Sequence, residues 1–86
     1  MTIIFAKSIH NYGISIDGCL QVIYNSPGNK IGLSREGSDK LAWVDFDQDG
    51  NLLEVIAINY KFYLYVIHLK PVERGRNINE IKKRFF

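Results

Sequence analysis

The sequence contains almost no cysteine, which excludes several classes of protein. A single cysteine, Cys19, excludes an internal disulfide and any zinc site built from cysteines. The N-terminus also lacks the basic segment and apolar stretch that are typical of a secretory signal. We therefore expect a protein of the reducing cytoplasm.

Long apolar runs and nucleotide-binding motifs are missing as well. The longest apolar run, around residues 64–67, is far shorter than the roughly 20 residues that cross a bilayer. The sequence contains no glycine-rich phosphate loop, no nucleophile elbow and no cysteine–histidine pair. We expect neither a membrane protein nor an enzyme that depends on those motifs.

What the chain does contain is typical of a folded globular protein. It has 86 residues, of which 47% are hydrophobic and 23% are charged. This composition excludes a disordered or low-complexity chain, and the length predicts a single domain over residues 1–86. The functional site and its scaffold must therefore share the same few elements.

Positive charge is concentrated at the C-terminus. The net charge is +2 for the whole chain, but residues 1–69 carry −2 and residues 70–86 carry +4. Such a segment could attract a polyanion or an acidic protein, although it could equally be a solvated tail. Its basic residues are Lys70, Arg74, Arg76, Lys82, Lys83 and Arg84.

The apolar spacing predicts a short strand and then a short helix at the N-terminus. Residues 2–5 are bulky and favour a strand. From Phe5 the apolar residues recur at Ile9 and Tyr12, a helical spacing that stops at Gly13. We predict a first helix over residues 5–12.

A second helix is predicted from Ser15 to about Asn25. Serine is a favourable N-cap, and Pro27 cannot continue a helix. The apolar face of this helix is predicted to consist of Ile16, Cys19, Leu20 and Ile23.

After the second helix the pattern changes to that of strands. Four candidates follow one another at residues 30–34, 41–46, 52–58 and 62–70. The Asp49-Gly50 pair and the short connection at residues 59–61 indicate hairpins, so the last three strands should form an antiparallel meander.

The tail favours one more helix. Asn77 and Glu80 have the spacing of a reciprocal cap, and Ile78, Ile81 and Phe85 could line one face. We expect this basic helix to cover or border the face that holds Glu54 and His68. The predicted fold class is therefore α+β: two short N-terminal helices packed on an antiparallel sheet, with a short basic C-terminal helix.

A carboxylate, an imidazole and an ammonium group are predicted to share one face of the last hairpin. If that hairpin closes around residues 59–61, Glu54 lies opposite Val66 and becomes a diagonal neighbour of His68. Lys70 falls on the same face by the period of two. The three groups could perform acid–base chemistry on a phosphate ester. Alternatively, Glu54 neutralises Lys70, and His68 is partly buried near the end of the sheet.

Three aspartates around the second hairpin resemble the start of a calcium loop. Asp45, Asp47, Asp49 and Gly50 match its opening, but Ile56 stands where a bidentate glutamate is required. A hairpin tip is the better interpretation, and we expect neither a metal nor a cofactor.

His10 is a possible accessory residue of the site. It lies beside the apolar stripe of the predicted first helix, where a lone histidine is more often a capping or edge-of-core group. His10 and His68 are the only histidines, and no H-x-x-x-H spacing exists for a metal.

Aromatic residues are dense in the last strand and the connection before it. Tyr60, Phe62, Tyr63 and Tyr65 could stack nucleic-acid bases beside the basic tail. Their alternation equally fits a packed strand, which is the interpretation we favour for most of them.

Three stretches in this order resemble a known family. They are HNYGIS (residues 10–15), AWVDFDQDGNLLEVIAI (residues 42–58) and VIHLKP (residues 66–71). Together they resemble the BrnT-like toxins, small toxins of bacterial toxin–antitoxin pairs with a RelE-like ribonuclease fold, over most of residues 5–76. The resemblance implies an RNA-cleaving toxin, dependent on the ribosome or not, that is neutralised by an antitoxin encoded beside it.

The resemblance also points to particular residues. Its two best-matching strands contain Glu54 and His68, and the basic residue after the last strand is matched by Arg74 or Arg76. We expect a metal-independent endoribonuclease in which Glu54 or His68 transfers protons, while Lys70, Arg74 and Arg76 bind the phosphate. Lys82, Lys83 and Arg84 would add to RNA binding.

The expected partners are a cognate antitoxin and messenger RNA, free or on the ribosome. The alternative is a non-catalytic module of the same fold that binds protein or RNA. Its support is the modest net charge and the lack of a dense catalytic cluster.

Overall fold

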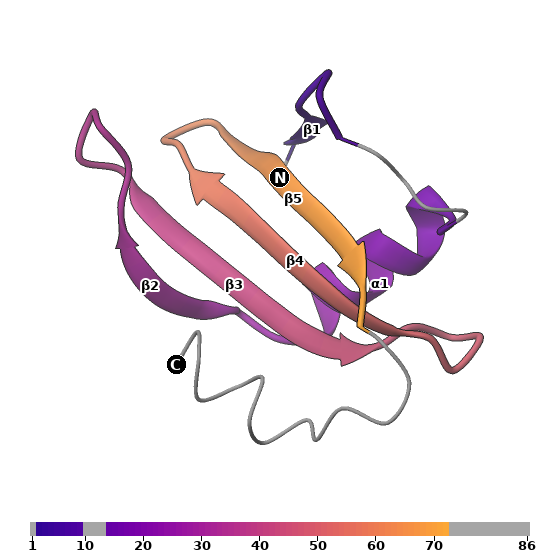
Figure 1. Ribbon diagram of the computed structural model, residues 1–86. Coiled ribbons are helices and arrows are strands. Elements are labelled where there is room, and N and C mark those ends of the chain that lie inside the picture. The colour runs from indigo at the N-terminus through magenta and orange to yellow at the C-terminus, as the bar shows by residue number, and fades with distance from the viewer. Residues whose placement is uncertain (1, 10–13, 73–86) are drawn as a thin grey trace.

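The computed structural model describes residues 2–9 and 14–72, which form a five-stranded sheet with one helix packed against it (Figure 1). The helix, α1, spans Ile16–Asn25. The strands are β1 (Thr2–Phe5), β2 (Asn29–Leu33), β3 (Asp39–Phe46), β4 (Leu52–Asn59) and β5 (Tyr63–Pro71). The predicted α+β class is confirmed, whereas the predicted C-terminal helix lies outside the described residues.

The sheet is mixed rather than purely antiparallel. Its order is β1-β5-β4-β3-β2: β3 to β5 form the predicted antiparallel meander, and β2 extends it by pairing antiparallel with β3. β1, however, pairs in parallel with β5 along the edge that the meander leaves open. The prediction of an antiparallel sheet is wrong for this strand, because no hairpin signal can link two segments so far apart in the chain.

The predicted first helix is wrong where the structure describes it. Phe5 ends β1, and the Ile9 N–H donates to the Ala6 carbonyl at 3.1 Å in a turn. The helical spacing has another origin, since Phe5 and Ile9 both pack against the core, one from a strand end and one from the turn after it. Residues 10–12 lie outside the described residues.

The second predicted helix is confirmed as α1. The Ser15 hydroxyl accepts the Gly18 N–H at 3.0 Å, which caps the N-terminus, and Asp17 in the first turn complements the helix dipole. The helix ends at Asn25, before the residue that precedes Pro27.

The buried face of α1 differs from the predicted one. Ile16 is 46% exposed, while Val22, absent from the predicted face, is fully buried. The helix is rotated so that Gly18, which is also buried, lies against Asp47 in the loop after β3. The buried residues of α1 are Gly18, Cys19, Val22 and Ile23.

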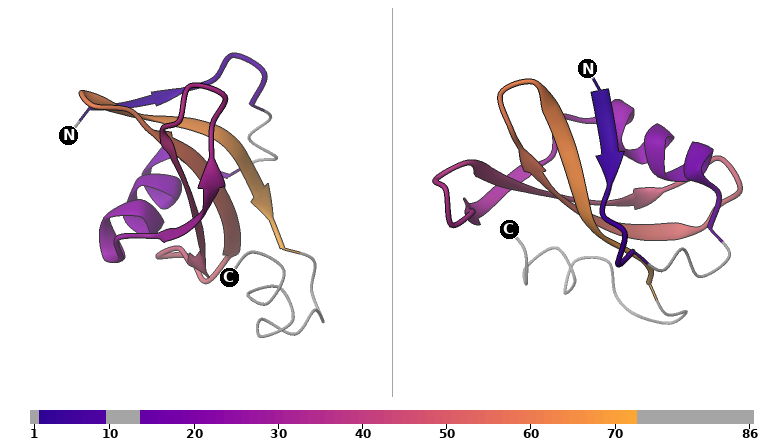
Figure 2. Two further views of the ribbon diagram at one scale, coloured as in Figure 1. Left: turned by 90° about the vertical axis from the view of Figure 1, so that its left-hand side faces the viewer. Right: turned by 90° about the horizontal axis from the view of Figure 1, so that it is seen from above.

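The core lies between α1 and one face of the sheet (Figure 2). Alternate residues of the strands point into it, as the strand period of two requires. The inward residues of the three central strands include Trp43, Leu53, Val55, Ala57, Leu64, Val66 and Leu69. We call the opposite side the outer face. It carries Lys40, Ala42, Val44, Glu54, Ile56, Ile58, Tyr63, Tyr65, His68 and Lys70.

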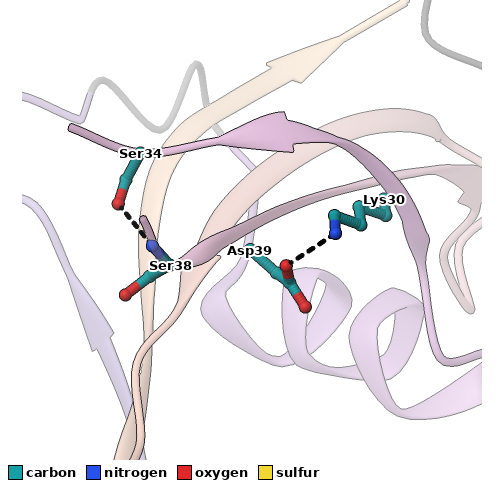
Figure 3. A network of polar contacts seen from close by, with 4 residues as sticks. All are labelled: Lys30, Ser34, Ser38 and Asp39. Atoms are coloured by element: carbon teal, nitrogen blue, oxygen red, sulfur yellow. Dashed lines mark hydrogen bonds and ion pairs between the residues drawn. The ribbon is translucent and has the colours of Figure 1, made fainter. Parts of the chain in front are cut away.

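Two polar contacts close the β2–β3 hairpin at the edge of the sheet (Figure 3). Lys30 Nζ lies 3.1 Å from Asp39 Oδ1, and the Ser38 N–H donates to the Ser34 hydroxyl at 3.1 Å. Both members of the ion pair are substantially exposed, so the pair contributes little to stability. No helix among the described residues has the length and apolar character needed to cross a membrane.

The turn after α1 is held against the core by Trp43. The indole Nε1–H donates to the Ser26 carbonyl at 2.8 Å, and the ring covers Gly28. Gly28 has a φ of +76°, and a Cβ there would lie 2.6 Å from Trp43 Cε2. Only glycine therefore fits between this turn and the indole.

Gly28→Ala should lower the free energy of unfolding by about 2–4 kcal/mol, since it adds a steric clash to an unfavourable backbone conformation. Gly37→Ala is the matched control, because Gly37 also has a positive φ, +83°, but has no atom within 4 Å of its Cβ position. It should cost only the backbone penalty of about 1–2 kcal/mol. Urea denaturation of both variants measures the difference, and equal losses would contradict the role of Trp43.

Candidate functional site

The predicted pairing of Glu54 with His68 exists on the outer face. Glu54 Oε1 of β4 lies 3.1 Å from His68 Nε2 of β5. The glutamate side chain is 9% exposed and the histidine side chain 36% exposed. The carboxylate is thus nearly enclosed, while the imidazole remains partly accessible to a ligand.

A β-bulge brings the two residues together. Ala57 pairs with Val66, but Ile56 pairs with His68, so Ile67 is an extra residue in β5. Without it, the alternation beyond Val66 would turn His68 toward the core. Because of the bulge, His68 points to the outer face and Leu69 points inward.

The predicted register is therefore wrong, although the predicted neighbours are right. Glu54 lies opposite Lys70, not opposite Val66. His68 is still the diagonal neighbour of Glu54. The assumed register put both residues on one face, and the extra residue in β5 has the same effect. Lys70 is exposed beside the pair, on the same face.

The geometry of the pair suits proton transfer through the imidazole. Glu54 engages Nε2, so it can hold the ring in one orientation. Nδ1 is the ring nitrogen that this contact leaves for another partner. Lys70, which lies opposite Glu54 on the same face, supplies a positive charge of the kind that binds a phosphate.

The other predicted site residues lie outside the described residues. They are His10, Arg74, Arg76, Lys82, Lys83 and Arg84. Glu54 also has an interaction besides the one with His68.

Asp47 serves the hairpin between β3 and β4, as the interpretation of a hairpin tip predicts. It is 7% exposed, and its Oδ1 accepts the N–H groups of Asp49 at 2.9 Å and Asn51 at 2.8 Å. Its Oδ2 lies so close to the first turn of α1 that a Cβ on Gly18 would be 2.9 Å away. The carboxylate thereby links the hairpin to the positive end of the helix dipole, a link that no local sequence signal indicates.

Cys19 is not a candidate nucleophile. The residue is fully buried in α1, and burial raises the pKa of its thiol to about 11. A thiol with this pKa stays protonated at neutral pH and is a poor nucleophile.

The aromatic residues of β5 and of the turn before it do not belong to the core. Tyr63 and Tyr65 lie on the outer face and are half-buried, with Tyr60 packed beside them from the β4–β5 turn. Burial and the nearby Glu36 carboxylate raise the pKa of Tyr60, so its hydroxyl stays protonated near neutral pH. Phe62 at the tip of the turn is 79% exposed, with Lys61 Nζ 5.4 Å from its ring centroid. Packing within a strand therefore does not fully explain why these four aromatic residues occur here.

Comparison with known proteins finds no matching family model, no matching curated protein and no matching solved structure. The function must therefore be argued from the residues themselves.

Asp47→Ala should lower the free energy of unfolding by about 2–3 kcal/mol, because it leaves two partly buried N–H groups of the hairpin without their acceptor. Asp45→Ala is the control: Asp45 accepts the exposed Phe46 N–H at 2.8 Å, and its loss should cost under about 1 kcal/mol. Chemical denaturation of both variants gives the two values. A rise in the melting temperature of the wild-type protein on adding calcium, absent in Asp47→Ala, would instead indicate a metal loop.

Proposed function

We propose that this protein is the toxin of a toxin–antitoxin pair and that it acts as a metal-independent endoribonuclease. The observation that carries the proposal is the contact of 3.1 Å between Glu54 and a partly exposed His68, with Lys70 beside it. The sequence stretches that resemble BrnT-like toxins contain this same pair, which gives the proposal a second and independent support.

His68 is the group that transfers protons in this proposal, because its side chain is four times as exposed as that of Glu54, 36% against 9%. Its imidazole takes the proton of a ribose 2′-hydroxyl, and that oxygen attacks the adjacent phosphate. The imidazolium then gives a proton to the leaving 5′-oxygen. The products are a 2′,3′-cyclic phosphate and a 5′-hydroxyl end.

Glu54 acts on this reaction through His68. Its carboxylate holds the imidazole in one orientation and stabilises the positive charge that the ring acquires. Lys70, together with Arg74 and Arg76, neutralises the charge that develops on the phosphate oxygens. Lys82, Lys83 and Arg84 attract the RNA chain electrostatically.

A RelE-like fold and a cognate antitoxin are parts of the same proposal. The fold is supported by the antiparallel meander that follows a helix, and the antitoxin by the resemblance alone. The cytoplasm is the proposed location, because RNA is found there and the lone cysteine fits a reducing compartment.

A non-catalytic module that binds protein or RNA is the second candidate. The low exposure of the Glu54 side chain favours it, since a carboxylate that is 9% exposed has little access to substrate. RNA that stays intact at high protein concentration, with and without EDTA, while still being bound, would support this candidate over cleavage.

Expression of the chain without an antitoxin should arrest growth, and His68→Ala or Arg74→Ala should relieve the arrest. Purified His68→Ala should cleave RNA about 10²–10⁴ times more slowly than the wild type, which should remain active in EDTA. Gel assays of labelled RNA measure the rates. Lys30→Ala, which removes the ion pair with Asp39 at the edge of the sheet, is the control and should cleave normally. Undiminished toxicity of both site variants would contradict the assignment.

Replacement of Lys82, Lys83 and Arg84 by alanine should weaken RNA binding and flatten its salt dependence. Each lost phosphate contact should reduce the slope of log K against log [salt] by about 0.7. Fluorescence anisotropy across a salt series measures the slope. Lys7→Ala with Lys30→Ala removes cations from the described part of the chain and should change the slope less per charge. The same slope for the wild type and the triple variant would show that the cluster is only a solvated tail.

A further inference from the structure

Three tyrosine rings form a continuous aromatic surface at one end of the outer face. Ring centroids are 5.1 Å apart for Tyr60 and Tyr63, 6.3 Å for Tyr60 and Tyr65, and 6.5 Å for Tyr63 and Tyr65. These separations are typical of favourable aromatic pairs. The rings therefore hold one another in place, and we call this group the tyrosine platform.

The platform is not needed to fill the core. The inward residues of the same stretch of β5 are Leu64 and Val66, which are 2% and 0% exposed. The tyrosines alternate with them and point to the side away from α1. A sheet face that only met water would carry polar side chains here, so the aromatic rings require another explanation.

Basic residues surround the platform. Lys40 lies on the same face, in the row that runs from Tyr65 through Ile58. Lys61 is exposed in the β4–β5 turn next to the rings, and Arg35 is exposed in the β2–β3 turn. Glu36 is the nearby acidic residue, and it interacts with Tyr60. Aromatic rings with cations around them match a ligand that has both planar bases and phosphates, better than they match an apolar protein segment.

We propose that the tyrosine platform binds single-stranded RNA by stacking its bases on Tyr63 and Tyr65. This inference rests on the proposed function, to which it adds the strandedness of the substrate and a binding surface. Every base has a π-face, so stacking would accept many sequences but would exclude the paired bases of a duplex.

The position of the platform fits this role. Tyr65 and His68 pair with Ile58 and Ile56, which are two residues apart in β4, so the bulge leaves the two side chains about 7 Å apart along the sheet at about 3.3 Å per residue. A chain of RNA stacked on the platform would thus run along the outer face toward the Glu54–His68 pair. Lys40 lies in the cross-strand row of Tyr65, and Lys70 lies in the row beyond His68, so the RNA would pass one cation before the imidazole and one after it.

The test measures binding of a labelled, 2′-O-methylated single strand of about 12 nucleotides, which the wild-type protein cannot cleave, by fluorescence anisotropy. Tyr63→Leu with Tyr65→Leu should raise the Kd about tenfold or more, because leucine keeps apolar contacts but cannot stack. Tyr63→Phe with Tyr65→Phe should bind like the wild type. Tyr24→Leu is the matched control, since Tyr24 is 65% exposed on α1.

A Kd of the double leucine variant within about twofold of the wild type would overturn the platform, given that stacking is worth far more than this per base. So would equal affinity for a duplex of the same sequence. If the leucine variant does not fold, photocrosslinking of bromouracil-containing RNA to the wild-type protein replaces it. Crosslinks at Tyr60, Tyr63 or Tyr65 support the platform, and crosslinks confined to other residues overturn it.

Cleavage of unmodified RNA by the same proteins separates this inference from the proposed function. Stacking that depends on the tyrosines, without any cleavage, would keep the platform and overturn the ribonuclease. Cleavage that depends on His68, with a KM unchanged in the leucine variant, would keep the ribonuclease and overturn the platform.

Discussion

The extra residue in β5 is the constraint on which the outer face depends. Up to Val66 the strand follows one alternation, and beyond Ile67 it follows the opposite one. The change keeps Leu69 in the core and turns His68 outward to Glu54. In a regular strand with Val66 in the core, Leu69 would point outward and His68 inward, because the side-chain period is two. β-Bulges commonly re-aim side chains near functional sites, and this one has that effect.

The two faces of the sheet consequently have separate tasks. The inner face packs under α1, and the α1 N-terminus is tied to the β3–β4 hairpin through Asp47, so the scaffold is stabilised on that side. The outer face carries the hydrogen-bonded pair of Glu54 and His68 at one position and the tyrosines at another. In a chain of 86 residues, this division allows one sheet to be both the core and the proposed RNA-binding surface.

Much of the local structure could be predicted because its signals are local. Ser15 and Pro27 bracket α1, and the Asp49-Gly50 pair marks a hairpin whose Gly50 has a φ of +80°. The failure of the predicted first helix at residues 5–9 has a physical reason too. Apolar residues at helical spacing show only that they are buried, and a strand end followed by a turn buried Phe5 and Ile9 equally well.

The sequence by itself determined the α+β class, the meander, the cap of α1 and the presence of a carboxylate and an imidazole of suitable spacing. The tertiary structure alone decided that β1 pairs in parallel with β5, that α1 turns Val22 rather than Ile16 inward, and that His68 reaches Glu54 through a bulge. The physical reason is the range of the interactions. Caps, turns and alternation act within a few residues, whereas sheet order, helix rotation and bulges follow from packing many distant side chains into one core.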